Sequence, residues 1–198
     1  MTVTLGIHKL DTVPTRQVAS EKARALLSAM LRDSGIEAPI PLPIETGENG
    51  RPYLTLENAS VDFNLSHAGH YVACVLAVAD RDDETPRVGV DVEIPHERTD
   101  PERLARRFFA PAEIRFLEEN GFSGESFLRV WTAKEAYMKF TGMGLSGGMQ
   151  KTDTTAPESL SPVAVIARYP LDTELAICSV AAPPSATLPQ KPTLYETL

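Results

Sequence analysis

Two stretches decide the fold of this chain: Val88-Gly-Val-Asp-Val-Glu93 and, about forty residues later, Trp131-Thr-Ala-Lys-Glu-Ala-Tyr-Met-Lys139. The first predicts a buried strand, because valines flank both acids. Asp91 and Glu93 stand two residues apart, so a strand directs both carboxylates to the same side of its sheet. Burying such acids unpaired would cost on the order of several kcal/mol each. We therefore expect either a bound cation or structural ion pairs on a solvated face.

The second stretch predicts a helix that carries Glu135 and Lys139 on one face. At about 100° per residue Thr132 shares that face, and an apolar stripe that includes Trp131 lies beside it. Three carboxylates can then converge with an ammonium, a set that suits a hard divalent cation and a phosphate-bearing substrate. The alternative is a surface ion pair, since Glu135 and Lys139 stand at i and i+4.

Composition restricts the class of protein. The 198 residues are 42% hydrophobic and 23% charged, which is ordinary for one domain or two small halves in close contact. The sequence shows neither an apolar run of about 20 residues nor a secretory signal, so we expect a cytoplasmic protein without membrane spans. The net charge of −8 argues against non-specific nucleic-acid binding.

The two cysteines, Cys74 and Cys178, each lie in an apolar, strand-like run. We expect them to be small buried hydrophobic residues. A reducing compartment disfavours a disulfide, and the spacing of a structural zinc site is absent from the sequence.

Periodicity and turn residues predict an α+β chain. The expected strands are residues 2–9, 53–56, 63–65, 71–79, 88–94, 163–169 and 174–181. The expected helices are residues 16–33, one that begins at 101, 111–119 and 124–141. Residues 36–50 and 142–148 are expected to be loops, and the Pro-rich tail, about 182–198, to be irregular. The strands around Cys74 and Cys178 give a weak two-fold echo.

Two shorter motifs suit phosphate binding. Ser66-His67-Ala-Gly69, which we expect in a turn after a strand, can offer a hydroxyl, an imidazole and backbone N–H groups. Gly50-Arg51-Pro-Tyr53 presents an arginine suited to a bidentate phosphate contact. A capping serine and a surface histidine are the ordinary explanation of the first motif.

Together these motifs resemble those of the 4′-phosphopantetheinyl transferases, and more narrowly the monomeric type that acts in peptide-synthetase, polyketide and siderophore pathways. The ordered set is GRPY at 50–53, FNLSHAG at 63–69, VGVDVE at 88–93, FFAPAE at 108–113 and WTAKEAYMKFTGMGL at 131–145, with Arg24 on an N-terminal helix. The resemblance implies two similar α/β subdomains related by a pseudo-two-fold axis, with coenzyme A between them. The corresponding halves are residues 1–95 and 96–198.

The same resemblance implies an activity, namely Mg²⁺-dependent transfer of 4′-phosphopantetheine from coenzyme A to a serine of an acyl or peptidyl carrier protein. The by-product is adenosine 3′,5′-bisphosphate. The implied metal ligands are Asp91, Glu93 and Glu135. The implied coenzyme contacts are Arg24, Arg51, Ser66, His67, Asp91, Lys134 and Lys139. We expect Glu135 to accept the serine proton, directly or through a metal-bound water, and Lys139 and His67 to stabilise the developing charge.

Two other functions fit the carboxylates alone. A metal-dependent phosphohydrolase or nuclease would release phosphate or nucleotide without a carrier protein. A non-catalytic coenzyme A-binding module would only pair its acids with Lys and Arg. If the substrate is an acidic carrier protein, the basic residues Arg103, Arg106, Arg107 and Arg115 are the expected docking region.

Overall fold

The computed structural model describes residues 1–47, 50–57, 59–81, 85–97, 99–143, 148–156, 160, 163–171 and 176–198. Its helices are α1 (Arg16–Asp33), α2 (Pro101–Phe108), α3 (Pro111–Asn120) and α4 (Gly124–Thr141), with a 3₁₀ turn η2 (Met149–Lys151). Its strands are β1 (Thr2–Lys9), β2 (Ile44–Thr46), β3 (Pro52–Leu54), β4 (Val61–Ala68), β5 (Tyr71–Val78), β6 (Gly89–Glu93), β7 (Val165–Pro170), β8 (Ile177–Ala182) and β9 (Thr193–Leu194).

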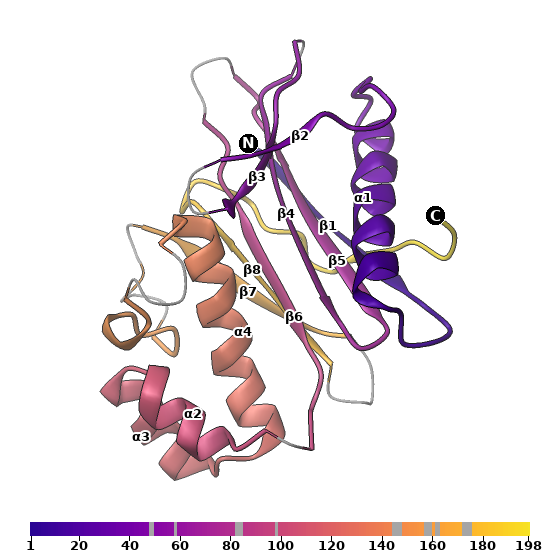
Figure 1. The fold of residues 1–198 in the computed structure, drawn as a ribbon. Helices are drawn as coiled ribbons and strands as arrows, with labels where there is room; N and C mark the ends of the chain where they lie inside the picture. The colour runs from indigo at the N-terminus through magenta and orange to yellow at the C-terminus, as the bar shows by residue number, and fades with distance from the viewer. Residues whose placement is uncertain are drawn as a thin grey trace.

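Two sheets form the centre of the molecule. The first has the strand order β4-β5-β1-β9, and the second has the order β6-β8-β7. Apolar side chains of β1 and β5 form one core with those of β6 and β8. Helix α1 packs on the first sheet and α4 on the second, so the helices lie outside the paired sheets (Figure 1). The expected α+β class is confirmed.

The two halves of the chain repeat one topology. β1, α1, β4 and β5 give the strand order β4-β5-β1, and β6, α4, β7 and β8 give the order β7-β8-β6. Cys74 on β5 and Cys178 on β8 occupy matching strands, and both are free and buried, as expected. Burial raises the pKa of both thiols, which keeps them protonated. The pseudo-two-fold axis and the boundary at residue 95 stay predictions.

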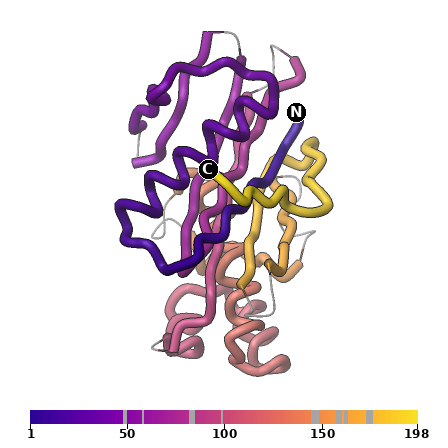
Figure 2. The backbone as a smooth tube through the Cα atoms, turned by 90° about the vertical axis from the view of Figure 1, so that its right-hand side faces the viewer, coloured from indigo at the N-terminus to yellow at the C-terminus, as the bar shows by residue number. Residues whose placement is uncertain are grey.

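Two residues of the tail, which we expected to be irregular, form a short strand. Thr193 and Leu194 pair in parallel with Gly6 and Ile7 of β1, and the amide of Tyr195 donates to the carbonyl of Ile7 at 2.8 Å. Figure 2 shows this yellow segment crossing the indigo N-terminal half. The expectation missed only this short pairing, because the free edge of β1 offers backbone hydrogen-bonding groups, which a tail with little periodicity of its own can still pair.

Other boundaries show where local patterns were insufficient. Ile44–Thr46, expected in a loop, pairs with Pro52–Leu54 as a small hairpin. The helix at 16–33 is confirmed, with Thr15 as its cap. The predicted loop at 142–148 and the predicted strand at 174–181 fall partly outside the described residues. Among the helices that the structure describes, none has both the length and the hydropathy of a membrane-spanning segment.

Candidate active site

The two sheets are joined where β4 and β6 run side by side. Alternate side chains of β4 accept hydrogen bonds from alternate backbone amides of β6 and of Val88, the residue before it. The three pairs are Val88 N to Asp62 Oδ2 (2.8 Å), Val90 N to Asn64 Oδ1 (3.0 Å) and Val92 N to Ser66 Oγ (3.3 Å). This side-chain ladder satisfies the amides of a buried strand and fixes β6 along β4.

Helix α4 approaches β6 closely at Gly89. A Cβ atom at this glycine would lie 2.1 Å from the carbonyl oxygen of Ala136 and 2.5 Å from the amide nitrogen of Phe140. Only glycine allows the helix backbone to come so near the strand. Gly89, Asp91 and Glu93 share one side of β6, so this approach places both acids beside α4.

Asp91 and Lys139 form the centre of the site. The Lys139 Nζ atom lies 2.7 Å from Asp91 Oδ1, 3.2 Å from Ser66 Oγ and 3.0 Å from the carbonyl oxygen of Val90. Ser66 also donates to Asp91 Oδ1 at 3.0 Å. The other carboxylate oxygen, Asp91 Oδ2, is buried and has no hydrogen-bond partner among the residues that the structure describes. One oxygen of a buried acid is therefore free for an added positive group.

Glu93 and Glu135 complete a set of three mutually repelling acids. Burial, the charge of Asp91 and the charge of Glu135 raise the pKa of Glu93 to about 7, with Lys139 opposing them. Burial and the charge of Asp91 raise the pKa of Glu135 to about 7, again opposed by Lys139. Burial also raises the pKa of Asp91. One lysine thus faces three carboxylates, and a further cation would stabilise their ionised forms.

Arg51 supports the C-terminal end of α4. Its guanidinium donates to the carbonyl oxygen of Lys139, to Asp62 Oδ2 at 2.5 Å and to the carbonyl oxygen of Val88 at 2.8 Å. Arg87 Nε donates to the carbonyl oxygen of Phe140 at 2.7 Å. These cations satisfy the last helical carbonyls, where the helix dipole favours positive charge.

Ser66 and His67 lie inside β4, and the expected turn is displaced to the next residues. Pairing with β5 continues through Ala68, and the hairpin turns at Gly69, whose φ is +53°. Successive residues of a strand point to opposite faces, so Ser66 reaches Asp91 while His67 is exposed. The expectation of a phosphate-binding turn at 66–69 is therefore wrong in its backbone, although Ser66 still joins the site.

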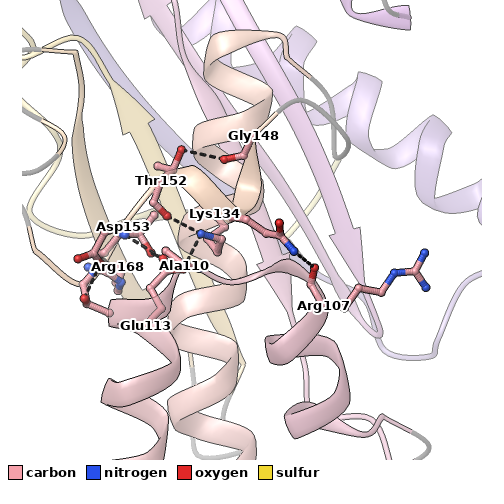
Figure 3. A network of polar contacts seen from close by, with 11 residues as sticks. Arg107, Ala110, Glu113, Lys134, Gly148, Thr152, Asp153 and Arg168 are labelled. Atoms are coloured by element: carbon pink, nitrogen blue, oxygen red, sulfur yellow. Dashed lines mark hydrogen bonds and ion pairs between the residues drawn. The ribbon is translucent and has the colours of Figure 1, made fainter.

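The structure divides the expected site residues into two groups. Ser66, Asp91 and Lys139 are in contact, and Glu93 and Glu135 interact with them through their charges. Arg24 is exposed on α1, and Lys134 is fully buried against Glu113 on another side of α4 (Figure 3). Within the described parts of the chain, no side-chain hydrogen bond or ion pair joins Arg24, His67 or Lys134 to the first group.

An apolar cavity of about 340 Å³ opens beside Glu93. Its lining includes Ile94, Leu104, Phe127 and Trp131. Trp131 stacks on Phe127 with ring centroids 5.6 Å apart, which gives one wall a rigid surface. The site therefore combines a charged centre with an adjacent apolar pocket of ligand size.

Comparison with known proteins identifies the family. The model of the 4′-phosphopantetheinyl transferase superfamily matches residues 87–181, which include β6, the helices α2 to α4 and β7. The chain is 32% identical over 159 residues to the 4′-phosphopantetheinyl transferase AcpT of Salmonella typhimurium, covering 79% of this chain and 73% of that protein. This chain belongs to the 4′-phosphopantetheinyl transferase superfamily.

Two further relatives of this superfamily member match over shorter stretches. A Synechocystis protein provisionally named a 4′-phosphopantetheinyl transferase is 37% identical over 118 residues, 57% of this chain and 45% of that protein. The 4′-phosphopantetheinyl transferase HetI of Nostoc is 32% identical over 127 residues, 62% of this chain and 49% of that protein. The chain thus spans about half the length of these two relatives.

Sequence reasoning missed several residues that build the site of this superfamily member. Asp62 and Asn64 hold the backbone of β6, Gly89 admits α4, and Glu113 binds Lys134. A signal for the first two existed, since polar residues alternate with apolar ones from Val61 to Ser66. The glycine and the buried glutamate gave no comparable signal.

The expected metal ligands do not form a finished metal site. Within the residues described, no three His, Cys, Asp or Glu side chains are arranged so that they could hold a metal ion as they stand. Lys139 binds the Asp91 Oδ1 atom that a cation would otherwise contact. The donor type still fits Mg²⁺, because carboxylate oxygens are its preferred protein ligands and Asp91 Oδ2 is buried with no partner in the described part of the chain.

Proposed function

We propose that this protein transfers the 4′-phosphopantetheine group of coenzyme A to a serine of an apo acyl or peptidyl carrier protein. The Asp91–Lys139 pair carries the proposal, because it places an ammonium among three acids whose pKa values are raised. This cluster of acids and one lysine can hold a diphosphate through the Lys139 ammonium and one added metal cation. Membership of the superfamily supports the same activity.

The added cation is proposed to be Mg²⁺, held by Asp91, Glu93 and Glu135. The free oxygen of Asp91 and the mutual repulsion of the acids support this assignment. When bound, Mg²⁺ neutralises charge on the diphosphate.

The residues of the chain then perform the transfer. Lys139 donates from a fixed position and stabilises the charge that develops on the diphosphate. The carrier serine attacks the phosphorus that bears the pantetheine arm, and the bond from that phosphorus to the bisphosphate oxygen breaks. Glu135 accepts the serine proton, because its carboxylate lies close enough to Asp91 and Lys139 to interact with their charges. In-line attack requires both oxygens to be held in place.

The apolar cavity beside Glu93 is proposed to take the pantetheine arm. It lies next to the acids, and its volume of about 340 Å³ is at the lower end of ligand pockets. Trp131 and Phe127 would pack against the arm while its phosphate faces Lys139. Arg24 and His67, which are exposed, stay proposed contacts for the coenzyme's other phosphates.

Arg51 keeps a proposed phosphate role besides its structural one. Three of its contacts go to protein oxygens, so a phosphate would have to share this guanidinium with α4. Binding of the coenzyme and the position of Lys139 would then be coupled through one side chain.

Helix α2 is the proposed docking surface for the carrier protein. Arg103, Arg106 and Arg107 are exposed on it, although Arg106 already pairs with Glu102 at 2.7 Å and with Glu118 at 3.5 Å. An acidic carrier would meet positive charge here despite the net charge of −8. We further propose that the protein acts as a monomer in the cytoplasm.

One assay tests the proposed function. The protein is incubated with coenzyme A, Mg²⁺ and an apo carrier protein, and the carrier is weighed by mass spectrometry. We expect the carrier to gain one phosphopantetheine group only when all components are present. Phosphate release without a carrier would favour a phosphohydrolase. Coenzyme A binding that is independent of Mg²⁺, with no mass gain, would favour a binding module.

A further inference from the structure

Glu113 is a fully buried carboxylate whose two oxygens accept four hydrogen bonds. Oε2 accepts from Lys134 Nζ at 2.5 Å and from the Ala110 amide at 2.8 Å. Oε1 accepts from the amide and the hydroxyl of Thr154, both at 2.8 Å. Both Glu113 and Lys134 have fully buried side chains, so the charge pair is removed from solvent (Figure 3).

This network ties three separate segments together. Ala110 is the cap of α3, Lys134 lies in the middle of α4, and Thr154 lies in the segment 148–156. Lys134 also donates to the carbonyl oxygen of Thr152 at 2.6 Å, and Arg168 of β7 donates to the carbonyl oxygen of Thr154 at 2.6 Å. The position of α4 is therefore fixed on this side by charged hydrogen bonds as well as by apolar packing.

On another side, the position of α4 is limited by the strand β6. At Gly89 the strand touches the backbone of Ala136 and Phe140, so the helix cannot move closer to the sheet. Lys134 precedes Glu135 by about 100° around the helix and Lys139 by about 140°. The contact with β6 and the buried Glu113–Lys134 ion pair thus act on different sides of α4. Together they set the rotation of this helix about its own axis.

Rotation of α4 controls the geometry of the active site. Side-chain tips lie roughly 5–6 Å from a helix axis, so a rotation of about 10° displaces them by about 1 Å. A misplacement of about 1 Å can cost on the order of 10²-fold in rate. Lys139 makes three hydrogen bonds of 2.7–3.2 Å that would be lost by such a shift.

We propose that Lys134 and Glu113 are positioning residues, which set the rotation of α4 and thereby the placement of Glu135 and Lys139, and that Lys134 does not contact the coenzyme. The proposal rests on the proposed transferase function for its kinetic consequence. It replaces the phosphate contact that the resemblance implied for Lys134, because the ammonium is wholly enclosed by Glu113, Thr152 and the ring of Phe109, whose centroid lies 5.5 Å away.

A double-substitution cycle tests this inference. Lys134→Met leaves Glu113 buried without its cationic partner, whereas Lys134→Met combined with Glu113→Gln removes both charges and keeps one acceptor oxygen, which can serve either Ala110 or Thr154. Lys151→Met is the control, because Lys151 is exposed in the neighbouring turn η2. The readouts are Tm, kcat, KM for coenzyme A and the emission of Trp131, the single tryptophan of the chain.

For Lys134→Met we expect a lower Tm, a shifted Trp131 emission and a kcat reduced on the order of 10²-fold, with KM for coenzyme A changed by less than about threefold. In the double variant we expect Tm, emission and kcat to recover together, kcat to within about tenfold of the unsubstituted protein. Lys151→Met should change none of the four readouts.

Two results would overturn the proposal. If the double variant folds with normal emission but has a raised KM for coenzyme A and a kcat as low as that of Lys134→Met, Lys134 acts on the substrate. If Lys134→Met folds with unchanged kcat, the pair only stabilises the fold. If Lys134→Met does not fold, the kcat and KM of the double variant alone distinguish a positioning role from a direct role of Lys134 on the substrate. An unsubstituted protein that transfers nothing would refute the proposed function, while the Trp131 emission cycle would still report on α4.

Discussion

Asn64 on β4 accepts a hydrogen bond from the backbone amide of Val90 on β6, with 3.0 Å between Oδ1 and the nitrogen, and both residues are buried. The flanking pairs of the side-chain ladder, Asp62 with Val88 and Ser66 with Val92, repeat the same spacing of 26 residues. A side chain therefore replaces the backbone carbonyl that an ordinary neighbouring strand would offer. Asp91 is held between two of these fixed amides.

Replacing Asn64 with alanine should destabilise the protein and disturb the site together. The amide of Val90 would lose its partner inside the protein, which costs about 1–3 kcal/mol. For a chain of this size, Tm should fall by roughly 2–4 °C per kcal/mol. Asn120→Ala is the matched control, because Asn120 is exposed at the end of α3. Calorimetry that gave both variants the same Tm would contradict a structural role for the ladder.

Gly89→Ala should be more damaging than an ordinary glycine substitution. The new methyl group would overlap the backbone of Ala136 and Phe140, which cannot move without displacing α4. We expect a loss of about 3 kcal/mol or more and little transfer activity. Gly6→Ala is the comparison, since its methyl group would meet the flexible Met30 Sδ at 2.6 Å. Denaturant titration should show a clearly smaller loss for Gly6→Ala, and equal losses would contradict the argument.

The contribution of Glu135 to the stability of the metal-free protein should fall as pH rises from about 4.5 to above 7. The folded-state pKa of Glu135 is about 7, against an ordinary value of 4.5, so the folded state binds more protons in this window and loses that advantage as pH increases. Glu135→Gln removes this group. The quantity to measure in EDTA is the Tm of Glu135→Gln minus the Tm of the unsubstituted protein. This difference should be more positive at pH 8 than at pH 5. A difference independent of pH would show that the pKa is not raised.

Mg²⁺ should reverse this effect if the three acids bind it. Added Mg²⁺ at pH 8 is expected to raise the Tm of the unsubstituted protein, because the cation binds the ionised carboxylates of the folded state. Asp91→Asn should lose most of this gain. Thermal scans with and without Mg²⁺ measure it, and an equal gain in both proteins would place the cation elsewhere.

Glu135→Gln should abolish transfer while the fold is kept. Removing the proposed proton acceptor is expected to lower kcat by about 10²–10⁴-fold. Glu119→Gln, an exposed change on α3, serves as the control and should be fully active. The carrier-mass assay gives the rate and circular dichroism the fold. Full activity of Glu135→Gln would remove the residue from the mechanism.

Reversing charge on α2 should weaken carrier binding only. Arg107→Glu is expected to raise KM for an acidic carrier protein severalfold and to leave coenzyme A binding unchanged, because Arg107 is exposed on α2. Lys191→Glu in the exposed tail makes the same change in net charge at another place. Steady-state kinetics on both variants measure KM for the carrier protein. Equal KM values would show that the carrier does not bind at α2.

The helices and most strands could be predicted from the sequence because their signals are local. Thr15 caps α1, Ser123 caps α4, and Gly142 ends α4 in the left-handed conformation. β2 and β9 could not be predicted, since each depends on a partner strand elsewhere in the chain. The position of Ser66 in a strand was missed for the same reason, because the pairing with β5 decides where the turn falls.

The sequence by itself determined the acidic strand and the helix with Glu135 and Lys139, since periods of two and 3.6 residues assign side chains to faces. Only the tertiary structure decided which faces meet. It directed Lys139 to Asp91 and enclosed Lys134 with Glu113, two lysines that stand five residues apart in one helix and look alike in the sequence. The physical reason is that burial and charge pairing depend on neighbours distant in the chain, and local patterns carry no information about them.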